Sequence, residues 1–578
     1  MEQSVSAAPS TGGMAAVSSP HSLASDAGVE ILAAGGNAFD ATVAVALGIG
    51  VAEGYHSGIG GGAIILYRTA DGQLGALQGR GTAPRELHRS RFFENNELQW
   101  DRVTEGPLSS IVPGLLASLH RLWRERGRLD WDRVCAPAVR LAEEGFPVDR
   151  FFADHFHTAP VKEKLGRHAG SAYLVPGDDG VRRGTWMKQH DLAQTMRRLA
   201  TEGIEPFYQG DIGERIASHV QELGGVMTFD DLRQYQPSSI STASITYRGW
   251  TVAAPAFPCL GGIQVLQILK LLERFPLYEM GFASSEYLHV LLEAFKLAFA
   301  ERAAMGADGI PLSHIEDDYL AELSERIQPG RTMPRLDDYL QPPEHGQHTS
   351  HFSVQDREGN AVSATQTVGS LWGSGVVVPG TGIIMNNTVS DFSLVPDSLT
   401  QQGVLYKDDG NLLAPGKMPG SNQSPIIAFR ADGATVAVGA AGGPRIVSAV
   451  AQSLINHIDF GMSMADSLNA PRVHSHGTFV ETEGWIARDT ARQLEAWGHD
   501  LRATARADRV LRQGGDLDTN RPKDSGRSMG CVVQAVASDP EGNLDGAADP
   551  RGSGSAPVLG GEGKKRWVEN SGYIIRSY

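Results

Sequence analysis

Three short motifs contain residue types that can do chemistry, and the sequence around each argues against a functional reading. Gly58–Ala63 fits a relaxed dinucleotide fingerprint, but that site needs a strand before the glycines and a helix after them, and here the order is reversed. Ser528 stands in a nucleophile-elbow pattern, yet a polar loop precedes it and a strand pattern follows. His345, His348 and His351 recur every third residue, but they run from a linker into a strand and share no helical face. We therefore expect no cofactor and no metal.

A threonine stands where a linker-like stretch meets a strand pattern. Residues 328–347 contain four prolines and mixed charges without a period, which indicates a linker or loop. Residues 349–354 and 361–367 then predict two strands of a hairpin. From the residue types alone, Thr349 is most simply the first residue of a strand, where threonine is common. Its hydroxyl becomes a good nucleophile only if a base takes its proton.

Composition limits the kind of protein this can be. The 578 residues are 41% hydrophobic and 20% charged, as in ordinary folded proteins, and the 68 glycines suit a loop-rich enzyme. A net charge of −16 argues against a nucleic-acid partner. The longest mainly apolar stretch, residues 41–52, is shorter than the roughly 20 residues of a membrane span. Because no Lys or Arg precedes Arg68, we see no secretory signal and expect a cytoplasmic protein without a membrane partner. Three scattered cysteines form neither a disulfide framework nor a zinc pattern.

Periodicity and turn residues predict the remaining elements. The region from 111 to 302 is mostly helical by period, and the tail after residue 541 is rich in Gly, Ser and Ala, so we expect it to be loosely held. Elsewhere we predict helices at residues 22–34, 38–52 and 444–457, strands at 63–68, 74–77 and 435–439, and a glycine turn at 440–443.

Several segments, in a fixed order along the chain, resemble the γ-glutamyltransferase (glutathione hydrolase) family. They are residues 22–41, 57–62, Arg80 three residues before Ala83-Pro84, 349–367, 382–387 with Asp391-Phe392, 421–425 and 442–446. The resemblance implies an α+β fold, the four-layer αββα sandwich of N-terminal-nucleophile hydrolases. It also implies that the chain cuts itself, so that residues 1–348 and 349–578 form a heterodimer of two intertwined fragments.

The resemblance assigns the catalytic groups as well. The cut would fall between His348 and Thr349, with the Thr349 hydroxyl attacking the carbonyl of His348. This frees an α-amino group whose pKa of about 7.7–8.0 suits it to act as the base. Thr367 would orient the nucleophile, and the N–H groups of Gly442 and Gly443 would stabilise the oxyanion.

The same resemblance implies six donor-binding positions: Arg80, Ser421 and Asn422 for the α-carboxylate, and Asp391, Gly369 and Thr388 for the α-amino group. Asn422 stands where the family has a second serine. Gly369 stands where it usually has Asn, and Thr388 where it usually has Glu or Gln. Two lost hydrogen bonds to a charged group, at about 1.5–3 kcal/mol each, would weaken binding by roughly 10²–10⁴-fold. Restoring Asn and Glu should improve γ-glutamyl turnover only if the pocket still receives an amino group.

Three functions therefore fit the sequence. The first is a hydrolase or transferase that passes a γ-glutamyl or related acyl group from a small-molecule donor to water or an amine. The second is a relative with an altered donor pocket, such as a glutaryl- or oxamate-type amidase or a specialised-metabolism hydrolase, including one that cleaves a C–C bond. The third is a non-catalytic paralogue that stays uncut, against which the intact Thr349, Thr367, Gly442 and Gly443 argue.

Overall fold

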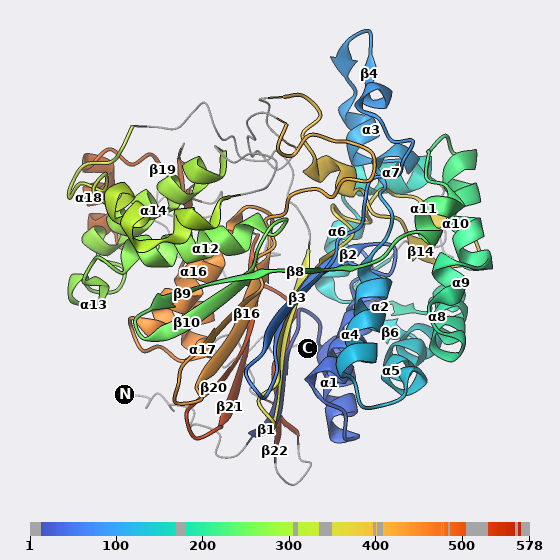
Figure 1. Cartoon of the computed structure of the whole chain (residues 1–578), viewed down its shortest axis with the longest axis horizontal. Helices are drawn as coiled ribbons and strands as arrows, with labels where there is room; N and C mark the ends of the chain where they lie inside the picture. The colour runs from blue at the N-terminus through green and yellow to red at the C-terminus, as the bar shows by residue number, and fades with distance from the viewer. Residues whose placement is uncertain are drawn as a thin grey trace.

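A computed structural model describes residues 13–168, 181–303, 310–334, 349–396, 400, 409–475, 477, 479–483, 486–503, 530–560 and 565–567. Two antiparallel β-sheets pack face to face, and helices cover the outer face of each, giving four layers (Figure 1). The predicted αββα sandwich is confirmed.

The first sheet has eight strands and contains both predicted hairpins. In spatial order its strands are β23 (Lys565–Trp567), β22 (Pro557–Gly560), β1 (Gly13–Ser18), β11 (Ser350–Asp356), β12 (Ala361–Thr367), β2 (Gly62–Arg68), β3 (Leu74–Gly79) and β8 (Ser238–Ile240). The β11–β12 hairpin lies between β1 and β2, so strands from after Thr349 are paired on both sides with strands from before it.

The second sheet has six strands and packs on the first through small and branched side chains. Its strands are β21 (Leu544–Ala548), β20 (Val532–Ser538), β16 (Thr435–Ala441), β15 (Ile426–Phe429), β10 (Trp250–Pro255) and β9 (Thr242–Tyr247). Between the sheets lie Ala16, Leu66, Ala361, Ile427, Ala437 and Val536. Because many of these side chains are small, the sheets approach closely enough for Ser363 Oγ of β12 to donate to the Val438 carbonyl at 3.0 Å.

Helices from the first part of the chain cover the first sheet, and those in direct contact with it are α1 (Ser22–Ala33), α2 (Ala38–Ala52) and α4 (Leu115–Arg126). This part of the chain also forms α3 (Trp100–Thr104), α5 (Trp131–Glu144), α6 (Arg150–Phe156), α7 (Ala159–Arg167), α8 (His190–Glu202), α9 (Glu205–Tyr208), α10 (Asp211–Glu222) and α11 (Phe229–Arg233), with the short strand pairs β4 (Phe93–Glu94)–β5 (Glu97–Leu98) and β6 (Phe146–Pro147)–β7 (Trp186–Met187). Helix α2 starts at a capping box formed by Asn37 and Asp40. It is apolar all round because it is buried between β11–β12 and the neighbouring helices.

The second sheet is covered by α12 (Leu260–Leu272), α13 (Leu277–Met280), α14 (Ser285–Ala303), α15 (Asp317–Ser324), α16 (Arg445–Ile458), α17 (Met464–Asn469) and α18 (Arg488–Ala496). A small sheet of β17 (Val473–Ser475), β18 (Val480–Thr482) and β19 (Leu501–Ala503) flanks these helices, and the pair β13 (Val377–Val378)–β14 (Ile383–Ile384) lies near α10. No helix of the described ranges is long and apolar enough to cross a membrane.

The middle of the chain is mostly helical, as predicted, although residues 238–255 form β8, β9 and β10 and pass from one sheet to the other. One prediction about these elements was wrong. Between residues 544 and 560 the tail is not loosely held, because β21 and β22 are integral strands. Between them the buried Asp549 carboxylate accepts from Arg472 Nη2 at 2.6 Å and from the Val533 N–H at 3.0 Å. Such long-range pairing is not visible in the local composition of the tail.

Candidate active site

One small pocket gathers most of the predicted site residues from distant parts of the chain. It holds about 280 Å³ of empty space including its mouth, and is lined by Arg80, Thr349, Thr367, Gly369, Asp391, Ser421, Asn422, Gln423, Gly443 and Ile446. Eight of these ten had been predicted; Gln423 and Ile446 had not. Gly442 and Thr388 do not line it, and His348 lies outside the described residues.

The candidate nucleophile stands at the start of a central strand. Thr349 immediately precedes β11, and Thr367 ends β12, so the hairpin pairing brings the two threonines together. Thr349 Oγ1 donates to Thr367 Oγ1 at 3.4 Å. The Gly369 N–H donates to Thr367 Oγ1 at 2.8 Å, which fixes that hydroxyl. Both threonines are buried.

The predicted oxyanion donors lie at the turn from β16 into α16. Gly442 has φ +143°, and a Cβ there would lie 2.8 Å from Cys531 Cα, so only glycine fits. Outside the sheet ladders, no described hydrogen bond uses the N–H of Gly442 or Gly443. Two such donors beside the start of a 14-residue helix suit a developing negative charge.

The charged groups predicted for the two ends of a glutamyl donor meet each other. Arg80 Nη1 donates to Ser421 Oγ at 2.8 Å, and Arg80 Nη2 forms an ion pair with Asp391 Oδ2. The resemblance implied separate binding groups for carboxylate and amino ends, whereas here the two charges are buried side by side. A donor must therefore insert beside an existing ion pair.

The side of the pocket that was predicted to bind an α-amino group also differs from the family pattern. Gly369 has φ +100°, and a Cβ there would lie 2.0 Å from Asn387 Oδ1. Asn387 Oδ1 accepts from the Ser370 N–H at 2.8 Å, so this amide fills the space beside the glycine. Thr388 is buried in a short 3-10 helix. The sequence comparison had matched Asn387 to the family without giving it a role.

A buried carboxyl group lies next to the nucleophile strand and was missed by the sequence analysis. Ser350 Oγ donates to Glu53 Oε2 at 3.0 Å. Burial raises the pKa of Glu53 to about 7, and nearby Asp149 acts in the same direction. The signal that could have found it is the single charge that ends the long apolar stretch of α2.

His351 belongs to the histidine motif for which the sequence argued against a metal site. In the structure its contacts are those of a buried strand residue. It is buried in β11, with Nδ1 hydrogen-bonded to Thr365 Oγ1 at 2.8 Å and Nε2 to Ser353 Oγ at 3.2 Å. Burial lowers the pKa of His351 to about 3, so the ring is neutral. His345 and Ser528 lie outside the described residues.

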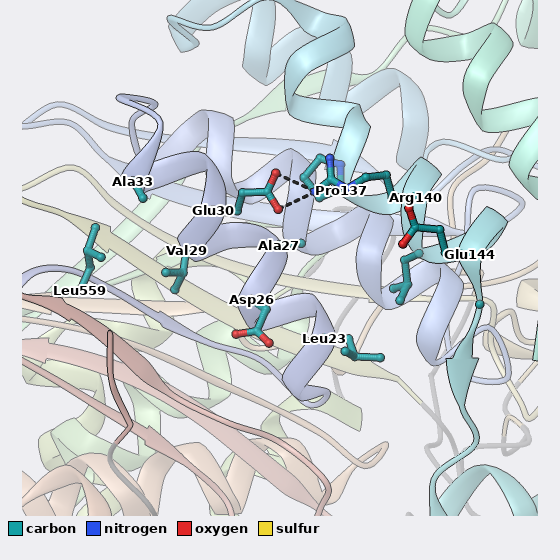
Figure 2. A pocket seen from close by; sticks show the side chains of 12 residues that line it. Leu23, Asp26, Ala27, Val29, Glu30, Ala33, Pro137, Arg140, Glu144 and Leu559 are labelled. Atoms are coloured by element: carbon teal, nitrogen blue, oxygen red, sulfur yellow. Dashed lines mark hydrogen bonds and ion pairs between the residues drawn. The ribbon is translucent and has the colours of Figure 1, made fainter. Parts of the chain in front are cut away.

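A larger hollow lies on the outer face of α1 and α5, away from every predicted site residue (Figure 2). It contains about 910 Å³ of empty space, open solvent included, and an ion pair between Glu30 and Arg140 at 2.6 Å crosses it. Its lining offers no nucleophile with a neighbouring base, so it does not compete as the active site.

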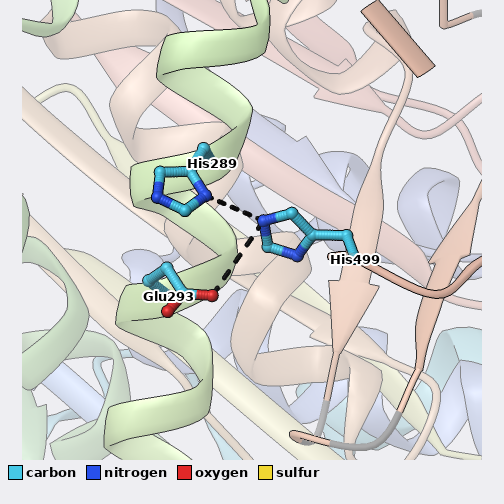
Figure 3. Close-up of side chains that lie close together, drawn as sticks. All are labelled: His289, Glu293 and His499. Atoms are coloured by element: carbon cyan, nitrogen blue, oxygen red, sulfur yellow. Dashed lines mark hydrogen bonds and ion pairs between the residues drawn. The ribbon is translucent and has the colours of Figure 1, made fainter. Parts of the chain in front are cut away.

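A second buried cluster has residue types that can bind metals (Figure 3). His289 Nδ1 is hydrogen-bonded to His499 Nε2 at 2.8 Å, and His499 Nε2 lies 4.0 Å from Glu293 Oε1. Lys296 Nζ already donates to that carboxylate oxygen at 2.7 Å, and the other oxygen accepts from the Met333 N–H. Because an ammonium balances the carboxylate, we interpret the group as a network that anchors the chain near Met333.

The chain is similar in sequence and in fold to known proteins. The sequence matches the family model described as Gamma-glutamyltranspeptidase over residues 24–559. It is 32% identical to the glutathione hydrolase proenzyme of Escherichia coli K12, over 93% of this chain and 90% of that one. It is 31% identical to the Acylase ACY 1 proenzyme of Pseudomonas sp. V22, over 96% and 95%. Among solved structures, the cephalosporin acylase from Bacillus halodurans superposes with a TM-score of 0.79 at 28% identity, covering 96% of this chain and 98% of that one.

Proposed function

Because the chain belongs to the γ-glutamyltranspeptidase family of N-terminal-nucleophile hydrolases, we propose that it is a self-processing amidase whose nucleophile is Thr349. Its substrate is a small-molecule γ-glutamyl or related acyl donor, and its acceptor is water or an amine. The observation that carries the proposal is the convergence of Thr349, Thr367, Gly443 and Arg80 on one pocket, although they come from three separate segments.

Maturation begins with the chain attacking itself. Thr349 Oγ1 adds to the carbonyl carbon of His348, the C–N bond between these residues breaks, and the nitrogen keeps the proton released by the hydroxyl. Water then hydrolyses the ester. This leaves a carboxylate on His348 and a free α-amino group on Thr349. With a pKa of about 7.7–8.0, this amine is partly unprotonated near neutral pH and can serve as the base.

Turnover uses the same groups. Thr349 Oγ1 attacks the donor carbonyl while its proton moves to the α-amino group. The N–H groups of Gly442 and Gly443 stabilise the oxyanion, and losing one such donor typically costs about 2.7–4 kcal/mol. The leaving amine takes the proton, and water or a second amine releases the acyl group from Thr349. The hydrogen bond to Thr367 directs the nucleophile.

A second candidate is an acylase for donors with a distal carboxylate and no amino group, such as a glutaryl amide. The ion pair of Arg80 with Asp391 favours it, because the carboxylate that would bind an ammonium is already neutralised. Gly369 and Thr388 favour it too, since neither supplies the amide or carboxylate that the family uses there.

Mass spectrometry of the purified wild type beside Thr349→Ala and Thr349→Ser tests the proposal. We expect the 61.9-kDa wild-type chain to give two fragments, the second starting at Thr349, and Thr349→Ala to stay intact. Thr349→Ser keeps a hydroxyl and should still cut. Turnover of γ-glutamyl and glutaryl p-nitroanilides by the cut enzyme then ranks the two donor classes. A wild type that stays in one piece and releases no nitroaniline would instead favour an uncut binding paralogue.

A further inference from the structure

A second arginine stands behind the wall of the donor pocket. Arg302, in the last turn of α14, is fully buried. Its Nη1 donates to Asn422 Oδ1 and, at 3.0 Å, to Gln264 Oε1. Asn422 lines the pocket directly after Ser421, which accepts from Arg80. Two consecutive residues of the wall are therefore held by two buried guanidinium groups.

The contact fixes how the Asn422 amide is turned. A guanidinium can only donate hydrogen bonds, so the amide oxygen must face Arg302 and the NH₂ group must face away from it. A serine hydroxyl could rotate and either donate or accept at this position. In this orientation the Asn422 side chain presents only the N–H donors of its NH₂ group on the side that faces away from Arg302.

The neighbouring groups make the pocket end suited to an anion. Arg80, which also pairs with Asp391, and the Ser421 hydroxyl are further donors on this wall. Both Arg80 and Arg302 favour the ionised form of the Cys259 thiol, against the burial that raises its pKa to about 12. The fields of the two arginines thus overlap beside the segment that carries Asn422, where Cys259 Sγ donates to the Gln423 carbonyl at 2.8 Å.

We propose that Arg302 is a specificity-determining positioning residue: it holds Asn422 so that the amide NH₂ binds the distal carboxylate of the acyl donor. This inference rests on the proposed function. It means that Asn422 supplies an oriented N–H donor where the family has a serine hydroxyl. A carboxylate can accept from Arg80, Ser421 and Asn422 together. A donor with a distal carboxamide would place its own NH₂ group against one of these three hydrogen-bond donors. It should therefore bind more weakly than the carboxylate donor.

Asn422→Asp tests this with little change of shape. The variant keeps an oxygen for Arg302 but replaces the NH₂ by a carboxylate oxygen. Loss of one hydrogen bond to a charged group, about 1.5–3 kcal/mol, corresponds to roughly 10–100-fold. We expect the Kd of L-glutamate or glutarate, measured by calorimetry, to rise at least that much. In turnover, KM for the carboxylate donor should rise while its carboxamide analogue gains relative to it.

Arg302→Gln and Arg302→Lys complete the test. Arg302→Gln should lower the preference for carboxylate over carboxamide donors by about 10-fold or more through KM, and Arg302→Lys should restore part of it. In an Asn422→Ser background, Arg302→Gln should change the preference by less than about twofold, since the residue to be held is gone. Gln264→Leu removes the other described contact of Arg302 Nη1 and should leave the preference unchanged.

The outcomes separate the two proposals. A wild type that cuts itself and turns over donors, but whose carboxylate preference and ligand Kd survive Asn422→Asp, would overturn the role of Arg302 and leave the amidase intact. Failure of the wild type to cut would overturn the amidase, while the calorimetric comparison would still decide whether Asn422 binds a carboxylate. A wild type that binds neither glutamate nor glutarate would overturn the inference.

Discussion

Restoring the family's asparagine at position 369 should damage this enzyme rather than improve it. Sequence comparison alone suggests that Gly369→Asn would rebuild the binding group for an α-amino end. The structure predicts the opposite, because the backbone there has φ +100° and a Cβ would lie 2.0 Å from Asn387 Oδ1. The position is shaped for glycine.

The magnitude follows from the contacts that must change. A side chain in the left-handed region costs about 1–2 kcal/mol. Moving Asn387 aside breaks its 2.8 Å hydrogen bond to the Ser370 N–H, at a cost of about 1 kcal/mol. The same shift disturbs the Gly369 N–H that holds Thr367 Oγ1, worth about another 1 kcal/mol. The total is about 3–4 kcal/mol. When this cost destabilises the catalytically active conformation, kcat/KM falls by roughly 10²–10³-fold.

The assay compares kcat/KM for γ-glutamyl p-nitroanilide, the melting temperature and the extent of self-cleavage. Gly369→Ala is the matched control, since it carries the same Cβ without an amide and should lose a similar amount. Adding Asn387→Gly to Gly369→Asn opens the occupied space and should recover part of the activity. If Gly369→Asn alone raised γ-glutamyl turnover at an unchanged melting temperature, the reasoning from backbone conformation would be refuted.

Three further substitutions test the surroundings of the site. Burial raises the pKa of Glu53 to about 7 from 4.5, so the folded state binds more protons between these values and stability falls as pH rises through that window. Glu53→Gln should flatten the fall, measured as the free energy of urea unfolding at pH 5 and pH 8. In Gly439→Ala the new Cβ would lie 2.3 Å from His351 Cε1, which should cost about 1–3 kcal/mol and lower the melting temperature; an unchanged value would contradict the packing. Asp549→Ala leaves Arg472 without its buried 2.6 Å partner and should cost about 3–5 kcal/mol, whereas a loosely held tail would tolerate it.

The sequence predicted the parts of the site that depend on local pattern and order. Two short runs of strand-forming residues predict the β11–β12 hairpin, and pairing of that hairpin brings the Oγ1 atoms of Thr349 and Thr367 to 3.4 Å from each other. The glycine turn between β16 and α16 was likewise predicted, because a strand followed by glycines and Pro444 leaves few alternatives. Such features are encoded within about twenty residues of chain.

Contacts between distant residues could not be predicted in the same way. Arg80 and Asp391 were assigned separate partners, yet they lie 311 positions apart in sequence and pair with each other. Arg302 reaches Asn422 across 120 positions, and nothing in its helix distinguishes it from a solvated arginine at a helix end. Strands β8 and β22 are four residues or fewer and are defined by the neighbours they pair with. These features depend on packing between residues that are far apart in the sequence. Such packing leaves no periodic pattern from which it could be predicted.

The order of strands explains how such a chain can be cut at its centre without losing the site. In the first sheet β11 and β12 lie between β1 and β2, so each fragment of the proposed cut holds strands paired with the other. β22 closes the arrangement by pairing with β1. Releasing the peptide bond before Thr349 therefore frees one chain end while the ladder hydrogen bonds on both sides of β11 stay in place. The hydrogen bond from Ser350 Oγ to the buried Glu53 carboxyl group also holds the residue that follows the new terminus. A terminus anchored in this way keeps its hydroxyl beside Thr367 and the turn at Gly443, which is where an acyl donor has to be attacked.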